Sequence, residues 1–165
     1  MTFENLGLAP SLVRKIAEQG MSEPTPIQAK AIPLALKGRD VLGIAQTGTG
    51  KTAAFGLPLL HKLFKTKGKK EPKAVGGLIL APTRELVAQI SDSLAVYSHG
   101  THLRVTTVVG GASISAQMKR LNRGTNLLVA TPGRLIDLIE RKAVRLDLTR
   151  YLVLDEADQD RKSVV

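Results

Sequence analysis

The segment Ala45-Gln46-Thr47-Gly48-Thr49-Gly50-Lys51-Thr52 decides the fold of this chain. It follows an apolar run, residues 41–44, and it opens a stretch with helical spacing. Gly48 and Gly50 allow the backbone to curl so that successive N–H groups point inward, and the N-terminus of the following helix adds positive potential. A strand, such a loop and a helix in this order predict a phosphate-binding loop, although the general pattern begins with glycine where this chain has Ala45. A glycine-rich turn with an exposed lysine is the alternative.

The end of this loop and an acidic strand end together indicate a triphosphate with a metal ion. Lys51 is placed to hold the β and γ phosphates, and the hydroxyl of Thr52 is a ligand for Mg²⁺. Asp155 and Glu156 directly follow the apolar run 151–154, and adjacent carboxylates repel each other unless a cation lies nearby. We expect Asp155 to bind the metal directly or through water, and Glu156 to orient or deprotonate an attacking water. An acidic solvated turn is the alternative for this pair.

Short apolar runs bounded by turn residues predict five buried strands. They are residues 41–44, 77–81, 105–109, 127–130 and 151–154. Between them, apolar residues repeat every four positions and so form stripes on helix faces. These stripes are Leu12 with Ile16, Leu86 with Ile90 and Leu94, and Leu135 with Ile139. Strands that alternate with helices predict an α/β fold with a mostly parallel sheet covered on both faces, because parallel neighbours need crossover connections.

Each predicted strand runs directly into a polar or glycine-rich segment. The segments are residues 45–52, 82–86, 110–111, 131–134 and 155–158. In open parallel sheets ligands bind beyond the carboxyl ends of the strands, so all five segments should emerge at one edge. Five such segments at one edge predict a shared site.

The composition of the chain limits the kinds of protein to which it can belong. At 165 residues, with 43% hydrophobic and 23% charged residues, it suits one domain that folds in water. No apolar run approaches the ~20 residues of a membrane span, and the N-terminus lacks a signal-peptide pattern, so we expect a cytoplasmic protein without a membrane partner. The absence of cysteine excludes disulfides, thiol catalysis and thiolate metal sites.

The net charge of +10 indicates a polyanionic partner such as nucleic acid. Aromatic residues make up only 3% of the chain and tryptophan is absent, which leaves few platforms on which bases could stack. Any nucleic acid should therefore be bound through its backbone.

Taken together, these residues resemble the DEAD-box RNA helicases, and the bacterial RhlE-like branch is the most similar. The resemblance runs from about Phe3 to Asp158 and includes the literal Asp155-Glu156-Ala157-Asp158. It implies that residues 1–158 form the first, N-terminal RecA-like P-loop domain, truncated after the strand that carries this segment. Residues 159–165 depart from the family pattern as an atypical tail.

The resemblance implies that the nucleotide is ATP. Gly20 to Gln28 is similar to the adenine-reading segment of the family, which implies that Gln28 forms paired hydrogen bonds with adenine and that Thr25 belongs to the site. Phe3 lies 17 positions before Gly20, where the family carries an aromatic residue. Met21 departs from the phenylalanine or tyrosine usual at its position, which implies softer packing against adenine.

The resemblance also implies contacts with the sugar-phosphate backbone of one RNA strand. Arginines can fork onto phosphate oxygens, and glycine N–H groups and threonine hydroxyls can approach closely. None of these groups reads a base, so the binding should not depend on sequence. The residues are Pro82, Thr83, Arg84, Gly110, Gly111, Thr131, Pro132, Gly133 and Arg134.

In this family a second RecA-like domain closes over ATP and RNA and supplies arginine fingers. We therefore expect this chain to bind ATP and Mg²⁺ with little hydrolysis and no unwinding on its own. The family also has a strand between the phosphate-loop strand and the acidic strand, and we expect the gap to be closed by direct strand pairing, by self-association with another copy or by a disordered C-terminus. A non-catalytic RNA- or ATP-binding module and a motor acting on DNA remain alternatives.

Overall fold

A computed structural model describes residues 2–39, 50–66 and 71–155. The chain divides into two compact units. The first unit comprises Met1–Lys67 and Ser93–Gly100, and the second comprises Gly68–Asp92 and Thr101–Val165. The helix α4 (Arg84–Ser98) contributes residues to both. In the part of the chain so described, no helix is long and apolar enough to cross a membrane.

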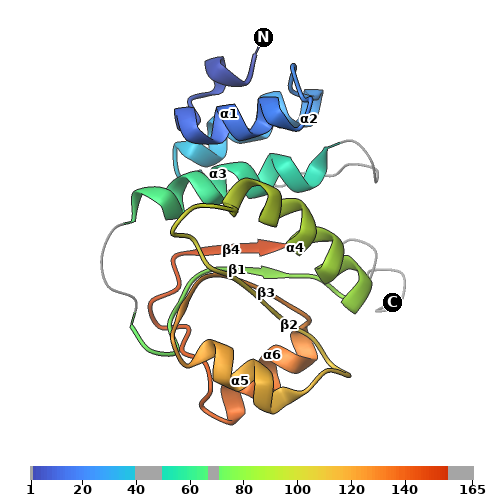
Figure 1. The fold of residues 1–165 in the computed structure, drawn as a ribbon, viewed down its shortest axis with the longest axis vertical. Coiled ribbons are helices and arrows are strands. Elements are labelled where there is room, and N and C mark those ends of the chain that lie inside the picture. The colour runs from blue at the N-terminus through green and yellow to red at the C-terminus, as the bar shows by residue number, and fades with distance from the viewer. Residues whose placement is uncertain (1, 40–49, 67–70, 156–165) are drawn as a thin grey trace. The chain divides into compact units, whose positions relative to one another are not determined.

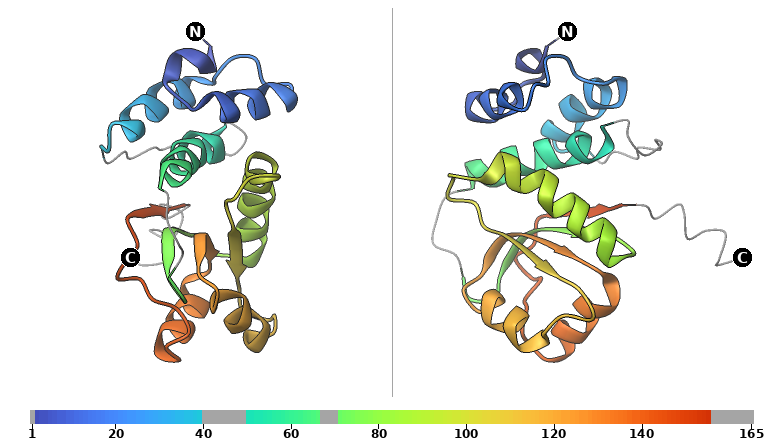
Figure 2. Two further views of the ribbon diagram at one scale, coloured as in Figure 1. Left: turned by 60° about the vertical axis from the view of Figure 1, so that its left-hand side comes forward. Right: turned by 45° about the vertical axis from the view of Figure 1, so that its right-hand side comes forward.

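The first unit is helical. It contains η1 (Phe3–Leu6), α1 (Pro10–Glu18), α2 (Pro26–Leu36) and α3 (Lys51–Lys65), besides the end of α4. The predicted stripe of α1 is confirmed, because Leu12 and Ile16 are 0% and 1% exposed. Helices α2 and α3 contact each other and lie side by side in Figures 1 and 2.

Close packing fixes the end of α4 within the first unit. A Cβ atom added to Gly56 of α3 would collide with the Cδ2 atom of Leu94. Leu94 and Ile90 are 0% and 1% exposed, whereas Leu86 is only partly buried. The predicted stripe of α4 is therefore confirmed in its central and C-terminal part. At its N-terminal end the exposure of Leu86 is greater.

His61 makes the stability of the first unit depend on pH. Its ring is buried in α3, and its Nδ1 atom accepts a hydrogen bond from the Ala9 N–H at 3.0 Å. Burial lowers the pKa of His61, and the positive charges of Lys65 and Lys62 lower it further. The unfolded chain therefore binds a proton at a higher pH than the folded chain does.

We expect the free energy of unfolding to fall as the pH drops below the ordinary histidine pKa of about 6.5 towards the lowered folded value. The variant His61→Asn keeps an acceptor near the Ala9 N–H but has no titrating ring, so its stability should vary less over the same range. Chemical denaturation at a series of pH values from 8 to 5 measures both profiles. Parallel profiles would show that His61 does not titrate with unfolding.

The second unit is built on a parallel sheet with the order β2-β3-β1-β4. The strands are β1 (Val75–Leu80), β2 (Val105–Val108), β3 (Thr125–Ala130) and β4 (Tyr151–Leu154). Four of the predicted strands are thus confirmed within one or two residues, and their parallel pairing is confirmed as well. The fifth, residues 41–44, lies outside the described residues.

Helices cover both faces of this sheet. On one face, α5 (Ile114–Leu121) and α6 (Pro132–Glu140) form an apolar core with the strands through Leu121, Leu135 and Leu138. The part of α4 that belongs to this unit, residues 84–92, lies on the opposite side of the sheet in Figures 1 and 2. The predicted stripe of α6 was wrong in one residue, because Ile139 is 41% exposed while Leu138 is fully buried. The buried face of this short helix passes through positions three apart, and Ile139 is turned away from it.

Strand β4 forms one edge of the described sheet. Leu152 and Leu154 stand in register with Leu78 and Leu80 of β1, so they point to the same face as these neighbours. They are nevertheless 59% and 58% exposed. How this edge is closed in solution, including by self-association, stays a prediction.

Candidate functional site

The segment predicted to read adenine contacts Gly50 of the predicted phosphate-binding loop within the first unit. Thr25 caps the N-terminus of α2, where its hydroxyl accepts from the Gln28 N–H and the Gln28 Oε1 atom accepts from the Thr25 N–H at 3.0 Å. The Nε2 atom of the same side chain donates to the carbonyl oxygen of Gly50 at 3.1 Å. One amide therefore joins the start of α2 to the residue that precedes α3.

Gly50 has a backbone conformation that suits this contact. Its φ angle is +81°, and an added Cβ would collide with the Nε2 atom of Gln28 and lie 3.0 Å from the hydroxyl oxygen of Thr25. Such positive φ angles favour glycine. Position 50 therefore requires glycine for two reasons, which are its backbone conformation and the lack of space for a Cβ atom next to Gln28.

Gln28 is only 3% exposed and retains part of its hydrogen-bonding capacity. An amide has two N–H donors and two acceptor lone pairs, and the contacts to Thr25 and Gly50 use one of each. Among the described residues, one donor and one acceptor of the amide remain, and this pair is the complement of the paired acceptor and donor on the adenine edge.

The other residues that we predicted to bind the nucleotide lie partly within the described chain. Lys51 and Thr52 form the first turn of α3, at the end where main-chain N–H groups give positive potential. Phe3 lies in η1 and is 3% exposed, in the core of the first unit, where η1 contacts α1 and α2. Gln46, Thr47, Gly48 and Thr49 lie outside the described residues.

In the second unit, register places the predicted segments at one edge of the sheet. The last residues of β1, β2 and β4 are Leu80, Val108 and Leu154. Leu80 pairs with Leu154 and with Ala130 of β3, and Val108 also pairs with Ala130. The segments that begin at Pro82, Gly110, Thr131 and Asp155 therefore leave the same edge, as predicted. Residues 45–49 lie outside the described residues and Gly50 to Thr52 belong to the first unit, so the prediction that residues 45–52 share this edge stays a prediction.

Two arginines are docked on the glycine loop at this edge. Arg84 donates from Nη1 to the Gly110 carbonyl oxygen at 3.4 Å, and Arg134 donates from Nη1 to the Ala112 carbonyl oxygen at 3.2 Å. Gly111 has a φ of +81°, and an added Cβ would collide with the Nη1 atom of Arg84. The loop therefore gathers both guanidinium groups, which come from α4 and α6.

Small residues leave space around these arginines. A Cβ on Gly110 or Gly133 would meet no atom of the described residues within 4 Å, so a ligand could approach the main chain closely there. The hydroxyl of Thr83 caps α4 by accepting from the Leu86 N–H at 3.1 Å, and its own O–H donates to no residue with a described position. Thr131 and Pro132 start α6 as N-cap and first residue.

Sequence reasoning missed Gln117 of α5. This side chain is 1% exposed, donates to the Val109 carbonyl oxygen at 3.0 Å and accepts from Arg134 at 3.1 Å. A glutamine inside an otherwise apolar helix face was the available signal, because a buried amide needs partners.

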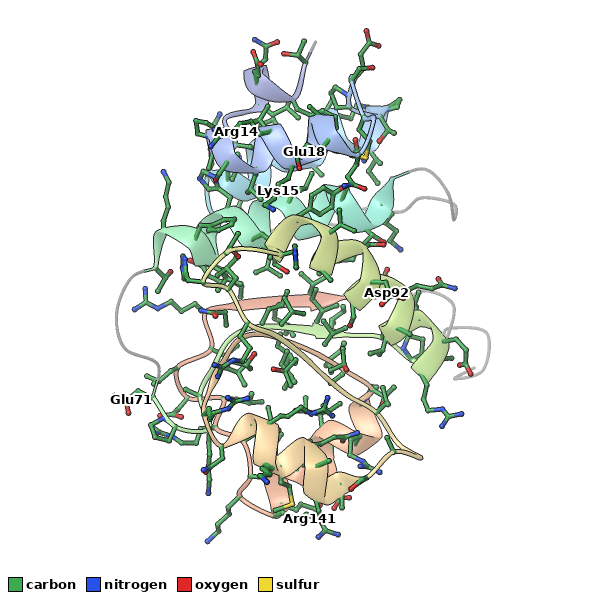
Figure 3. The ribbon with its side chains drawn as sticks, in the orientation of Figure 1. Arg14, Lys15, Glu18, Glu71, Asp92 and Arg141 are labelled. Carbon is green, nitrogen blue, oxygen red and sulfur yellow. The ribbon has the colours of Figure 1, made fainter. Side chains whose placement is uncertain are left out.

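The described ion pairs lie elsewhere on the second unit. They join Arg141 to Asp137 and Arg145 to Asp147 and Glu71, and Figure 3 labels Arg141 and Glu71 on its outer surface. Exposed pairs of this kind contribute little stability. Among the residues with described positions, Arg84 and Arg134 have no carboxylate partner, so their charge is available to an anion.

Comparison with known proteins identifies the family. Residues 25–163 match the model of the DEAD/DEAH box helicase family. The chain belongs to this family. It is 47% identical over 157 residues to the ATP-dependent RNA helicase CshA of Listeria monocytogenes, a match that covers 95% of this chain and 29% of that protein. It is also 47% identical over 159 residues to the DEAD-box ATP-dependent RNA helicase CshA of Streptococcus pneumoniae, with 96% and 29% covered.

A solved DEAD-box structure has the same fold. The RNA helicase Prp28 from Chaetomium thermophilum, bound to ADP, superposes with a TM-score of 0.87 at 43% identity, covering 98% of this chain and 40% of that chain. The predicted RecA-like α/β fold is confirmed. The chain spans less than a third of the length of the curated relatives. The RhlE-like branch and the domain boundary at residue 158 stay predictions.

The acidic segment that gives DEAD-box proteins their name begins within the described chain. Asp155 directly follows β4, is 5% exposed and donates its N–H to the Leu80 carbonyl oxygen at 2.9 Å. Glu156 lies outside the described residues. Thr52 and Asp155 are both oxygen donors of the kind that Mg²⁺ prefers, but they belong to different units. No cluster of three metal-ligating side chains occurs within residues 2–39, 50–66 and 71–155.

Proposed function

We propose that this chain is the ATP-binding and RNA-backbone-binding first domain, residues 1–158, of an ATP-dependent RNA helicase. The observation that carries the proposal is the hydrogen bond from Gln28 to Gly50. It joins the segment that would read adenine to the loop that would hold phosphate, as one bound nucleotide requires. The family membership of the chain supports the same conclusion.

In this proposal the first unit recognises ATP at two ends. Gln28 uses its remaining donor and acceptor for adenine, next to Thr25, with Phe3 supporting the segment. Main-chain N–H groups of residues 46–50 and the Lys51 ammonium neutralise the phosphates. The helix that begins at Lys51 adds its N-terminal potential.

Thr52 and Asp155 would hold Mg²⁺, since a hydroxyl and a carboxylate are suitable oxygen ligands. The ion would neutralise charge that develops on the phosphate oxygens. Glu156 would orient the attacking water and accept its proton. Lys51 would hold the transferred phosphate against the main-chain donors of the loop.

The second unit would bind the RNA backbone at the carboxyl edge of its sheet. Arg84 and Arg134 would contact phosphate oxygens, and Gly110, Gly111 and Gly133 would allow a close approach. Thr83, Thr131 and Pro132 would complete the surface. These groups position a backbone and read no base edge, so affinity should vary little with sequence.

Turnover by this chain alone should be very low. The second RecA-like domain, which we propose as its partner in the whole protein, would supply arginine fingers, and such cations contribute about 10³ to 10⁵ in rate to phosphoryl transfer. ATP hydrolysis with and without single-stranded RNA tests this. RNA-stimulated turnover would support the helicase domain, whereas ATP and RNA binding without any turnover, even with a second domain supplied, would support the non-catalytic module. Equal affinity for DNA of the same sequence would favour the DNA motor.

The variant Arg134→Ala tests the RNA surface directly. Loss of one phosphate contact should weaken binding of single-stranded RNA by about tenfold and reduce the slope of log affinity against log salt by about 0.7. Fluorescence anisotropy with a labelled oligouridine, at several salt concentrations, measures both values. Arg141→Ala is the matched control, because Arg141 directly follows the same helix but pairs with Asp137. Equal effects of the two variants would mean that only net charge matters.

A further inference from the structure

The buried amide of Gln117 lies between segments that we propose to bind RNA. Its Nε2 atom donates to the carbonyl oxygen of Val109, which precedes the glycine loop, and its Oε1 atom accepts from Nη1 of Arg134. A guanidinium only donates and a carbonyl only accepts. The amide nitrogen must therefore face Val109 and the amide oxygen must face Arg134. In this way one side chain of α5 connects the residue that follows β2 with α6.

Arg134 is held by more than Gln117. The same Nη1 atom also donates to the Ala112 carbonyl oxygen at 3.2 Å, so one nitrogen of the guanidinium has two acceptors. Its Nε and Nη2 atoms make no hydrogen bond to any residue that the structure describes. These two atoms form the edge of the guanidinium that can make parallel hydrogen bonds to two phosphate oxygens.

The same contacts hold the loop at both ends. Val109 is bound through Gln117, and Ala112 is bound through Arg134. Between them, Gly110 accepts from Arg84. Removal of the Gln117 amide would leave the Val109 carbonyl without this donor and would leave Arg134 with only one of its two acceptors. Both changes increase the number of conformations open to Arg134 and the loop.

We propose that Gln117 is a positioning residue for RNA binding: it holds the Arg134 fork and the Val109–Ala112 loop in the arrangement that receives a phosphate. Because it is buried, it does not touch RNA itself. It acts by ordering the long arginine side chain before RNA arrives, so that less conformational entropy is lost on binding. This inference rests on the proposed RNA-binding role of Arg134.

The variant Gln117→Met tests the proposal, since methionine has a similar length but neither an amide donor nor an amide acceptor. We expect RNA affinity to fall up to about tenfold, the loss that follows when one long side chain must be ordered during binding. In an Arg134→Ala background the same substitution should cause a smaller loss, because one of the two groups that it positions is absent and only its contact with Val109 remains. Affinity for Mg·ATP should not change.

The control is Gln19→Met, the same chemical change at an exposed residue of the first unit. Anisotropy with labelled oligouridine gives the RNA affinities, and nitrogen-15 relaxation of the Arg134 Nε–H group, without RNA, reports the order of the side chain. Lower order and weaker RNA binding in Gln117→Met would support the proposal. Unchanged RNA affinity, or an equal loss in the Arg134→Ala background, would overturn it.

The RNA affinities of the variants Arg134→Ala and Gln117→Met separate this inference from the proposed function. If Arg134→Ala also leaves RNA binding unchanged, then the RNA role of Arg134 is wrong, and the positioning role for RNA is wrong with it. If Arg134→Ala weakens binding but Gln117→Met does not, only the inference about Gln117 fails. A melting temperature lowered without any change in RNA affinity would show a purely structural glutamine.

Discussion

Replacement of Lys51 by alanine is expected to weaken Mg·ATP binding by about 100-fold, because each hydrogen bond to a charged group contributes about 1.5–3 kcal/mol. Lys51 begins α3, so its ammonium would add its charge to that of the helix N-terminus and the loop N–H groups. Alanine removes this charge but favours the helix. The fold of the first unit should therefore survive. Isothermal titration calorimetry measures the affinity, and circular dichroism checks the fold.

The control for this experiment is Lys65→Ala. Lys65 is the last residue of the same helix and is exposed, so the change in net charge is the same at the opposite end. We expect its Mg·ATP affinity to stay within about twofold of the wild type, since charges beyond a Debye length of about 10 Å are largely screened. Undiminished affinity in a folded Lys51→Ala variant would refute the phosphate-loop proposal and the helicase function with it.

Gly50→Ala is expected to lower both stability and nucleotide affinity. Placing a side chain at a φ of +81° costs about 1–2 kcal/mol in backbone strain. The new Cβ would also displace the amide of Gln28, which lies in its way. Loss of paired hydrogen bonds to adenine, about 1 kcal/mol each, should reduce ATP affinity by at least about tenfold. Urea denaturation and calorimetry measure the two effects.

The variant Gly100→Ala separates the effect of backbone strain from the effect of displacing the Gln28 amide. Gly100 has a similar φ of +75°, but an added Cβ would meet no atom of the described residues within 4 Å. Its variant should therefore show the backbone strain alone, with unchanged ATP affinity. A loss of affinity confined to Gly50→Ala would support the contact with Gln28. Wild-type affinity in Gly50→Ala would show that the position of Gln28 does not matter for nucleotide binding.

Local patterns predicted the second unit well. The runs around Leu78, Leu128 and Val153 are short and apolar, and β1, β3 and β4 follow them closely. Their parallel order followed from the intervening helices, and the emergence of Arg84 and Arg134 at one edge followed from that order. Such predictions succeed because strand periodicity and crossover geometry depend on neighbouring residues.

Predictions that depended on fine helix geometry or on long-range contacts were weaker. Leu135 and Ile139 are four residues apart, but the nine-residue helix α6 buries Leu138 instead of Ile139. This outcome depends on the rotation of the helix against its neighbours.

The sequence by itself determined the α/β fold class, the family and the residue types of the candidate site, because these follow from periodicity and from ordered motifs along the chain. Only the tertiary structure decided how these residues are used. It placed the Gln28 amide against Gly50, the guanidinium groups of Arg84 and Arg134 on one loop, and the amide of Gln117 beneath that loop. Gln28 and Gly50 are 22 residues apart, and Arg84 and Gly110 are 26 apart. Contacts across such separations depend on how whole helices and strands pack, and no local pattern encodes that packing.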